Sequence, residues 1–142
     1  MKPLIIVLAI TPFFTNTFAK VIGDKEVPKA VKAVFHQAHP SIFDVSWTLQ
    51  ESNYKVEYDV MRVDVAITYE ASGKLVETKT DVETATLPAA IVPYVKANYN
   101  QASINEAFKI KDDKGITTYK TDINDKCLLF DSAGNFIKEV KK

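Results

Sequence analysis

An internal repeat constrains the fold of this chain more than any other feature of its sequence. The segment Val27-Pro28-x-Ala30-Val31 returns 60 residues later as Leu87-Pro88-x-Ala90-Ile91. Four further pairs share an offset of 61, which suggests one inserted residue: Trp47 and Phe108, Tyr58 and Tyr119, Tyr69 and Phe130, and Gly73 and Gly134. Because a fixed period marks a repeated structural unit, we expect two copies of one unit, at about residues 26–82 and 86–142.

Each unit is expected to open with a helix. Pro28 suits the first turn of the first helix, and the His39-Pro40 pair favours its end. In the second unit Pro93 falls inside the expected helix, so that helix should start late or kink there. Apolar residues of the first helix recur at the spacing of one buried stripe: Val27, Val31, Val34, Phe35 and Ala38.

Strands should follow each helix, because apolar and polar residues alternate with period two. The alternating segments are residues 45–49, 54–60, 63–69, 74–80, 105–111, 116–122, 126–130 and 135–140. The expected fold class is α+β, a tandem repeat of a helix and a three- to four-stranded antiparallel sheet. The two half-sheets can join into one long sheet, with the helices on one face and the other face open.

The first 19 residues are typical of a secretory signal peptide. Lys2 precedes an apolar run over residues 4–10, and Thr17-Phe18-Ala19 places small residues at a cleavage site. A membrane anchor is the alternative, but Pro12 and three polar residues interrupt the run before the roughly 20 apolar residues that a span needs. We therefore expect a domain of residues 20–142, periplasmic or secreted, with no membrane span.

Composition and motifs argue against several functions. Lys+Arg and Asp+Glu both number 18, so net charge offers no attraction to nucleic acid. Neither a glycine-rich phosphate loop nor a Gly-x-Ser-x-Gly elbow is present, so we expect no enzyme and no cofactor. His36 and His39 could share a helix face and bind a metal, but a third ligand is missing. The single cysteine, Cys127, is either a small buried residue or a reactive thiol.

The open sheet face of the second unit is the candidate binding site. Apolar side chains are expected there where the repeat predicts polar ones, and such a patch can mark a protein interface. A register shift of one residue is the alternative, because it would bury the same side chains. The candidate partner-binding residues are Ile116, Thr118, Lys120, Cys127 and Leu129.

The repeated motifs also resemble a known family, the β-lactamase-inhibitor-like, PepSY-like domains that many bacteria export. The motifs that carry the resemblance are Val27-Pro28, Phe35, His39-Pro40, Trp47, Tyr54-x-Val56-x-Tyr58 and Gly73, repeated from Leu87-Pro88. The resemblance implies the fold of the β-lactamase inhibitor protein, whose concave sheet grips an enzyme. It therefore implies an exported, inhibitor-like module that binds a protein. It supplies no catalytic residue, and the alternative function is a periplasmic small-ligand or metal-binding protein.

Overall fold

A computed structural model describes residues 19–142. The predicted signal peptide therefore lies outside the described residues, apart from Ala19. Within the described part, no helix is long and apolar enough to cross a membrane. The fold is α+β, with one antiparallel sheet of nine strands in sequence order. The strands are β1 (Lys20–Ile22), β2 (Ser46–Gln50), β3 (Asn53–Val60), β4 (Val63–Glu70), β5 (Leu75–Asp81), β6 (Glu106–Asp112), β7 (Thr117–Ile123), β8 (Lys126–Asp131) and β9 (Phe136–Lys141).

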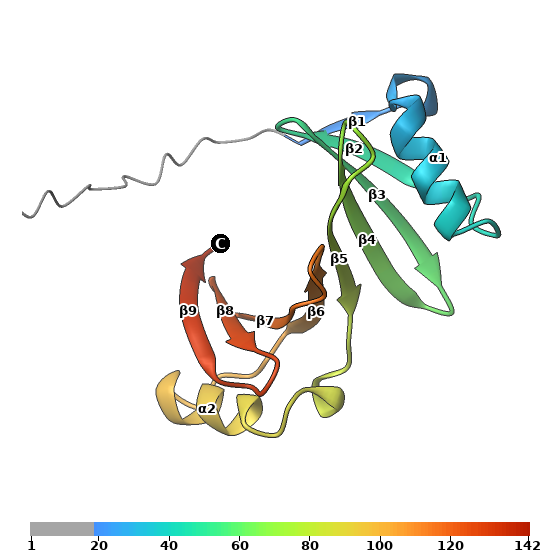
Figure 1. The fold of residues 1–142 in the computed structure, drawn as a ribbon. Coiled ribbons are helices and arrows are strands. Elements are labelled where there is room, and N and C mark those ends of the chain that lie inside the picture. Colours follow the sequence, from blue (N-terminus) through green and yellow to red (C-terminus); the bar gives the residue numbers. More distant parts are fainter. Residues whose placement is uncertain (1–18) are drawn as a thin grey trace, which may run out of the picture.

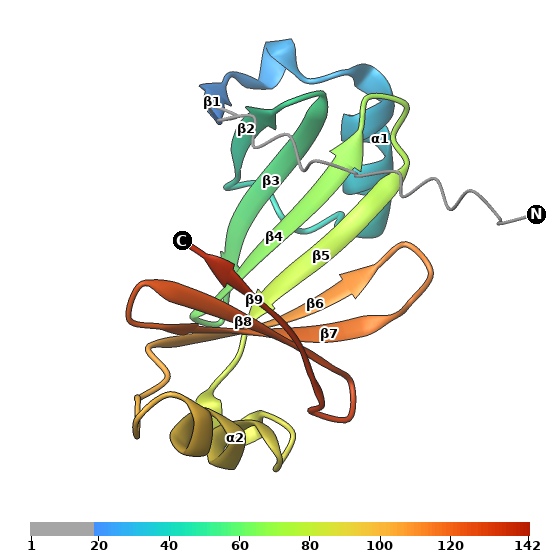
Figure 2. The ribbon, with the colours of Figure 1, turned by 90° about the vertical axis from the view of Figure 1, so that its left-hand side faces the viewer.

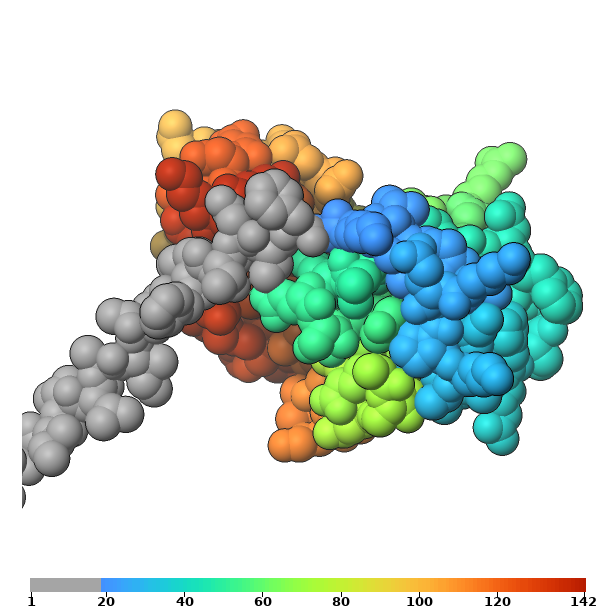
Figure 3. Space-filling view, turned by 90° about the horizontal axis from the view of Figure 1, so that it is seen from above, coloured from blue at the N-terminus to red at the C-terminus, as the bar shows by residue number. Residues whose placement is uncertain are grey.

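Two helices pack on the same face of this sheet. They are α1 (Lys29–Ala38) and α2 (Ile91–Asn98), and each follows a short 3-10 helix, η1 (Asp24–Glu26) or η2 (Thr84–Thr86). Figure 1 shows α1 against the N-terminal strands and α2 against the C-terminal strands. Seen from above, the N-terminal half (blue to green) and the C-terminal half (orange to red) lie side by side (Figure 3).

Each half has its own apolar core between its helix and its strands. In the first core Val31 and Phe35 of α1 pack on Trp47, Val56 and other side chains of β2–β4. In the second core, Ile91 and Val95 of α2 take the corresponding places, 60 residues later. The buried stripe of α1 is narrower than the sequence predicts: Val34 and Ala38 are exposed, because only one line of side chains, four residues apart, faces the sheet.

Pro93 is accommodated by a late helix start. It is the third residue of α2, where its missing N–H has no partner within the helix in any case. The following turn is regular, since Tyr94 N–H donates to the carbonyl of Ala90. As a result α2 has 8 residues and α1 has 10.

Strand register shows how the two units correspond. Residues in the same structural position are 60 apart in β2 and β6, 65 apart in β3 and β7, and 61 apart in β4 and β8. The equivalent pairs are Trp47 and Ala107, Val56 and Thr121, and Ile67 and Leu128. The β6–β7 hairpin is thus five residues longer than β2–β3, and β7–β8 is four shorter than β3–β4. The prediction of one inserted residue is therefore wrong.

Two expected residue matches change as a consequence. Trp47 packs under α1, whereas Phe108 follows Ala107, the true counterpart of Trp47, and so points to the other face of the sheet. Tyr58 and Tyr119 both face the helices but stand at different positions in their strands. Register instead pairs Tyr58 with Ile123, and Tyr54 with Tyr119.

The structural repeat also begins earlier than the sequence motifs suggest. Ile22 of β1 lies opposite Trp47, and Val82, at the end of β5, donates its N–H to the carbonyl of Ala107. Both relations have the offset of 60. The units therefore start at Lys20 and Thr80, and β5 serves as the last strand of one unit and the first of the next.

Candidate binding face

The face of the sheet opposite the two helices is open. Within residues 19–142, neither helix covers any part of it, and Figure 2 views the strands from this side. Alternate residues of each strand point to this open face. Cross-strand pairing continues the row from Glu57 through Ala66, Lys79 and Ile110 to Thr118, so one surface runs across both units.

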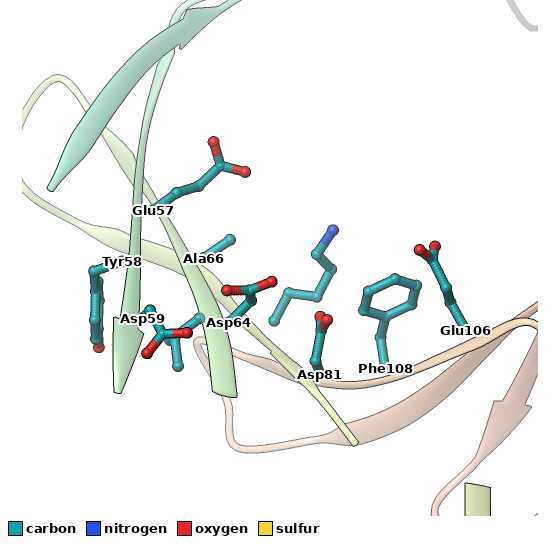
Figure 4. Close-up of a pocket in the computed structure, with 10 residues that line it drawn as sticks. Glu57, Tyr58, Asp59, Asp64, Ala66, Asp81, Glu106 and Phe108 are labelled. Atoms are coloured by element: carbon teal, nitrogen blue, oxygen red, sulfur yellow. The ribbon is translucent and has the colours of Figure 1, made fainter. Parts of the chain in front are cut away.

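An acidic hollow lies where the two units meet on this face. It has a volume of about 490 Å³ and draws side chains from β3, β4, β5 and β6. Figure 4 shows Glu57, Asp64, Asp81, Glu106 and Phe108 directed to the same side of the sheet. The lining residues are Glu57, Tyr58, Asp59, Asp64, Val65, Ala66, Lys79, Asp81, Glu106 and Phe108.

The electrostatics of the acidic hollow are unbalanced. Five carboxylates line it with a single lysine, Lys79. Burial raises the pKa of Asp81, the charges of Asp64 and Glu106 raise it further, and Lys79 only partly opposes them. The ammonium of Lys79 lies 4.6 Å from the centre of the Phe108 ring, a cation–π contact. The hollow therefore favours cationic groups brought from outside.

A second hollow lies further along the open face, on β7, β8 and the end of β9. We call it the Asp122 hollow, and its volume is about 620 Å³. Asp122 is nearly buried, with Oδ2 at 3.1 Å from Lys142 Nζ and Oδ1 at 3.5 Å from Lys120 Nζ. The lining residues are Lys120, Asp122, Cys127, Leu129, Val140, Lys141 and Lys142.

The structure brings three of the five predicted binding residues together. Lys120, Cys127 and Leu129 line the Asp122 hollow, and Thr118 lies on the same face of β7. Ile116 stands apart in the β6–β7 hairpin and is 58% exposed. The register shift considered as an alternative does not occur, since Leu129 lies opposite Lys120 and away from α2. Cys127 is a free, buried thiol whose pKa is raised by burial and by the adjacent Asp122.

Sequence reasoning missed the acidic hollow. Its carboxylates come from strands that are far apart along the chain, and each looks like an ordinary solvated residue of an alternating strand. A usable signal was Phe108, since an offset of 60 kept through β6 places this large aromatic side chain on the open face. The error in the repeat alignment concealed it.

The two histidines lie away from the open face. His39 packs its ring on Phe35 and Tyr58, with centroids 5.2 and 5.7 Å apart. His36 makes an edge contact with Phe35 at 5.5 Å. Across the described residues, no group of three or more His, Cys, Asp and Glu side chains is arranged to hold a metal ion.

Comparison with solved structures shows the same fold in proteins of Bacteroides. A protein of Bacteroides eggerthii, described as "putative periplasmic", superposes with a TM-score of 0.74 at 13% identity over 81% of this chain and 88% of its own. A protein of Bacteroides uniformis gives 0.74 at 18% identity over 80% and 88%. A BLIP-like protein of Bacteroides fragilis gives 0.65 at 15% identity over 80% and 86%. At these identities the likeness shows the fold alone, and no curated protein matches the chain.

One family model matches twice, at residues 15–77 and 58–138, in keeping with the tandem repeat. Its description is "Putative beta-lactamase-inhibitor-like, PepSY-like". The two matches together span most of the chain and agree with the BLIP-like structural neighbour. The chain therefore belongs to the β-lactamase-inhibitor-like, PepSY-like family.

Proposed function

We propose that this protein is an exported, non-enzymatic module that binds a protein partner on its open sheet face, in the manner of a β-lactamase or peptidase inhibitor. The observation that carries the proposal is the open face itself, which crosses both units and holds two hollows beside each other. Apolar and charged side chains on an uncovered, curved sheet can supply both contact area and specificity. The inhibitor-like family and the BLIP-like neighbour support this role.

A binding role fits the chemistry of the described residues better than catalysis does. Cys127 is buried and its pKa is raised, which disfavours the reactive thiolate. His36 and His39 pack with aromatic rings on the helix side of the sheet, far from the carboxylates of the acidic hollow. Among residues 19–142, no general base therefore faces a nucleophile on the open face.

Export is part of the same proposal. Residues 1–19 would be removed as a signal peptide, and the released domain would begin near Lys20 and act in the periplasm or outside the cell. The description of the Bacteroides eggerthii neighbour as periplasmic supports this location. N-terminal sequencing of the protein recovered from the periplasmic fraction would check the cleavage point.

The excess of carboxylates at the acidic hollow predicts a partner with a basic contact surface. Complementary charge accelerates association and fixes orientation, and its effect weakens as salt screens it. The test is capture of partners from periplasmic extract by the immobilised protein, at low and high salt. We expect the double variant Asp64→Lys, Asp81→Lys to lose the salt-sensitive partner.

A matched control places the same change of charge on the helix side. Lys29 and Lys96 are exposed residues of α1 and α2, so Lys29→Glu with Lys96→Glu should leave capture unchanged. Equal capture by the wild type and the open-face variant would contradict the proposal, as would loss of capture only in the helix-side variant.

A further inference from the structure

The Asp122 hollow contains a buried carboxylate oxygen that lacks a hydrogen-bond donor. Asp122 is 5% exposed, and among residues 19–142 its Oδ1 has no hydrogen-bond partner, although Lys120 Nζ stands 3.5 Å away. Burial acts to raise the pKa of Asp122, but the neighbouring Cys127, Lys142 and Lys120 outweigh it and lower that pKa. The carboxylate is therefore ionised at neutral pH. Because folded proteins pair nearly all buried acceptors, this oxygen points to a donor from outside.

The surroundings of Oδ1 restrict what that donor can be. Leu129, Val140 and Cys127 form an apolar surface beside it, while Lys120, Lys141 and Lys142 surround the hollow. A lysine or arginine side chain would meet three ammonium groups and be repelled. An aliphatic side chain would cover the apolar surface but leave Oδ1 without a hydrogen bond, at a cost in desolvation.

A neutral aromatic side chain with a donor at its tip satisfies both conditions. Tyrosine and tryptophan combine a large apolar ring with an O–H or N–H group, and both are enriched among the residues that dominate protein interfaces. Lysine ammonium groups also stabilise aromatic faces. Lys120 already lies 5.2 Å from the centre of the Phe108 ring, so its ammonium is placed for such a contact at the border of the hollow.

We propose that the Asp122 hollow receives a tyrosine or tryptophan side chain of the partner, which donates its O–H or N–H to Asp122 Oδ1 and is flanked by acidic residues. The acidic flanks follow from charge complementarity with Lys120, Lys141 and Lys142. This inference rests on the proposed function, since it names the anchor that the partner would place on the same open face.

The test compares two short peptides that differ in one hydroxyl group. Both are acetylated and amidated pentapeptides, Glu-Asp-Tyr-Asp-Glu and Glu-Asp-Phe-Asp-Glu, titrated into the isotope-labelled exported protein and followed by amide chemical shifts. We expect the tyrosine peptide to bind at least about tenfold more tightly, the size of one hydrogen bond to a charged group. The shifts should gather at Asp122, Cys127, Leu129 and Val140.

Variants separate this site from general charge effects. Leu129→Asp and Val140→Asp place a carboxylate in the hollow and should each abolish binding of the tyrosine peptide. Val140 is 38% exposed, so its variant should fold even if the Leu129 variant does not. Thr68→Asp adds the same charge elsewhere on the open face, near Glu77 and away from the hollow, and should leave the affinity within about twofold.

Three results would overturn the inference: equal affinity for the two peptides, no binding of either, or shifts confined to the acidic hollow or the helix side. A crystal structure in which an internal water donates to Oδ1, together with rejection of both peptides by the hollow, would also overturn it. These results leave the partner-binding function standing if capture still depends on Asp64 and Asp81. Loss of that dependence with intact tyrosine selectivity would instead contradict the proposed function.

Discussion

Asp81 stands at the centre of the acidic hollow, and its environment disfavours its charged form. Burial raises its pKa first, and Asp64 and Glu106 add to the rise. A carboxyl group whose pKa is raised on folding contributes stability below its usual pKa of 3.8, and this contribution disappears as the pH rises through the folded-state pKa. At neutral pH the ionised side chain is therefore tolerated at some cost to stability, as is common where a surface serves binding.

Replacing Asp81 by asparagine tests that cost. We expect Asp81→Asn to be more stable than the wild type at pH 7, by on the order of 0.5 kcal/mol for a half-buried charge interaction. The difference should shrink toward zero as the pH falls below about 4, where the wild-type carboxyl is protonated. Urea unfolding at a series of pH values measures it, with the exposed Asp44→Asn as the control. A difference that does not vary with pH would contradict this account.

Cys127 combines burial with a neighbouring carboxylate, which together raise the pKa of its thiol. It should therefore react slowly with Ellman's reagent in the native protein at pH 8, by at least about tenfold relative to the protein in denaturing urea, because the thiol must first become accessible. The time course of thiol release measures the ratio. Equal rates in the two conditions would show that Cys127 is reachable from the hollow.

At the scale of elements, the two helices are held against the sheet by matching turns. The β4–β5 turn contains Gly73, with φ of +88°, and the β8–β9 turn contains Gly134, with φ of +89°. Each glycine approaches the N-terminal part of its helix so closely that a Cβ atom would lie 2.9 Å from the carbonyl oxygen of Ala30, or 3.0 Å from Cβ of Pro88. The conformation and the contact both exclude other residues, which explains why glycine recurs at this place.

Gly73→Ala should therefore destabilise the protein. A left-handed conformation costs an alanine roughly 1–2 kcal/mol, and the contact with the α1 backbone adds to it. We expect a loss in free energy of unfolding of more than about 1 kcal/mol in urea denaturation. Gly23→Ala is the matched control, since Gly23 has a φ of −79° and open space around it, and it should change stability by less than about 0.5 kcal/mol.

At the scale of the whole molecule, the two cores are separate but the sheet is continuous. Five residue pairs join β5 to β6, and β5 belongs to both units. Uninterrupted pairing across this junction should make the two halves unfold together, in spite of their independent cores. The acidic hollow lies at this junction, so its geometry depends on the pairing of both units.

Trp47, the only tryptophan, offers a direct measurement of this coupling. It is buried in the first core, so its fluorescence reports the N-terminal half, while far-ultraviolet circular dichroism reports both halves. We expect the two urea transitions to coincide in the wild type. In Thr80→Pro, which disrupts the β5–β6 ladder, they should separate. Separate transitions in the wild type would mean that the units fold independently.

The sequence by itself determined the secondary structure and the repeat. Alternation of apolar and polar residues placed eight strands within one residue of their observed ends, and the helix pattern placed both helices, because these periods are local properties of the chain. The short strand β1 and the two 3-10 helices lack such a period and were not predicted. Lys120, Cys127 and Leu129 were also assigned to the open face correctly, since the alternation continues through β7 and β8.

Only the tertiary structure decided how the two units are aligned and what their junction forms. Hairpin lengths in β6–β7 and β7–β8 change by five and four residues in opposite directions, so the sequence shows only their difference of one. The acidic hollow, Phe108 at its edge and the buried Asp122 arise from strand pairing between distant segments. Such pairings depend on register across the whole sheet, which no local period in the chain encodes.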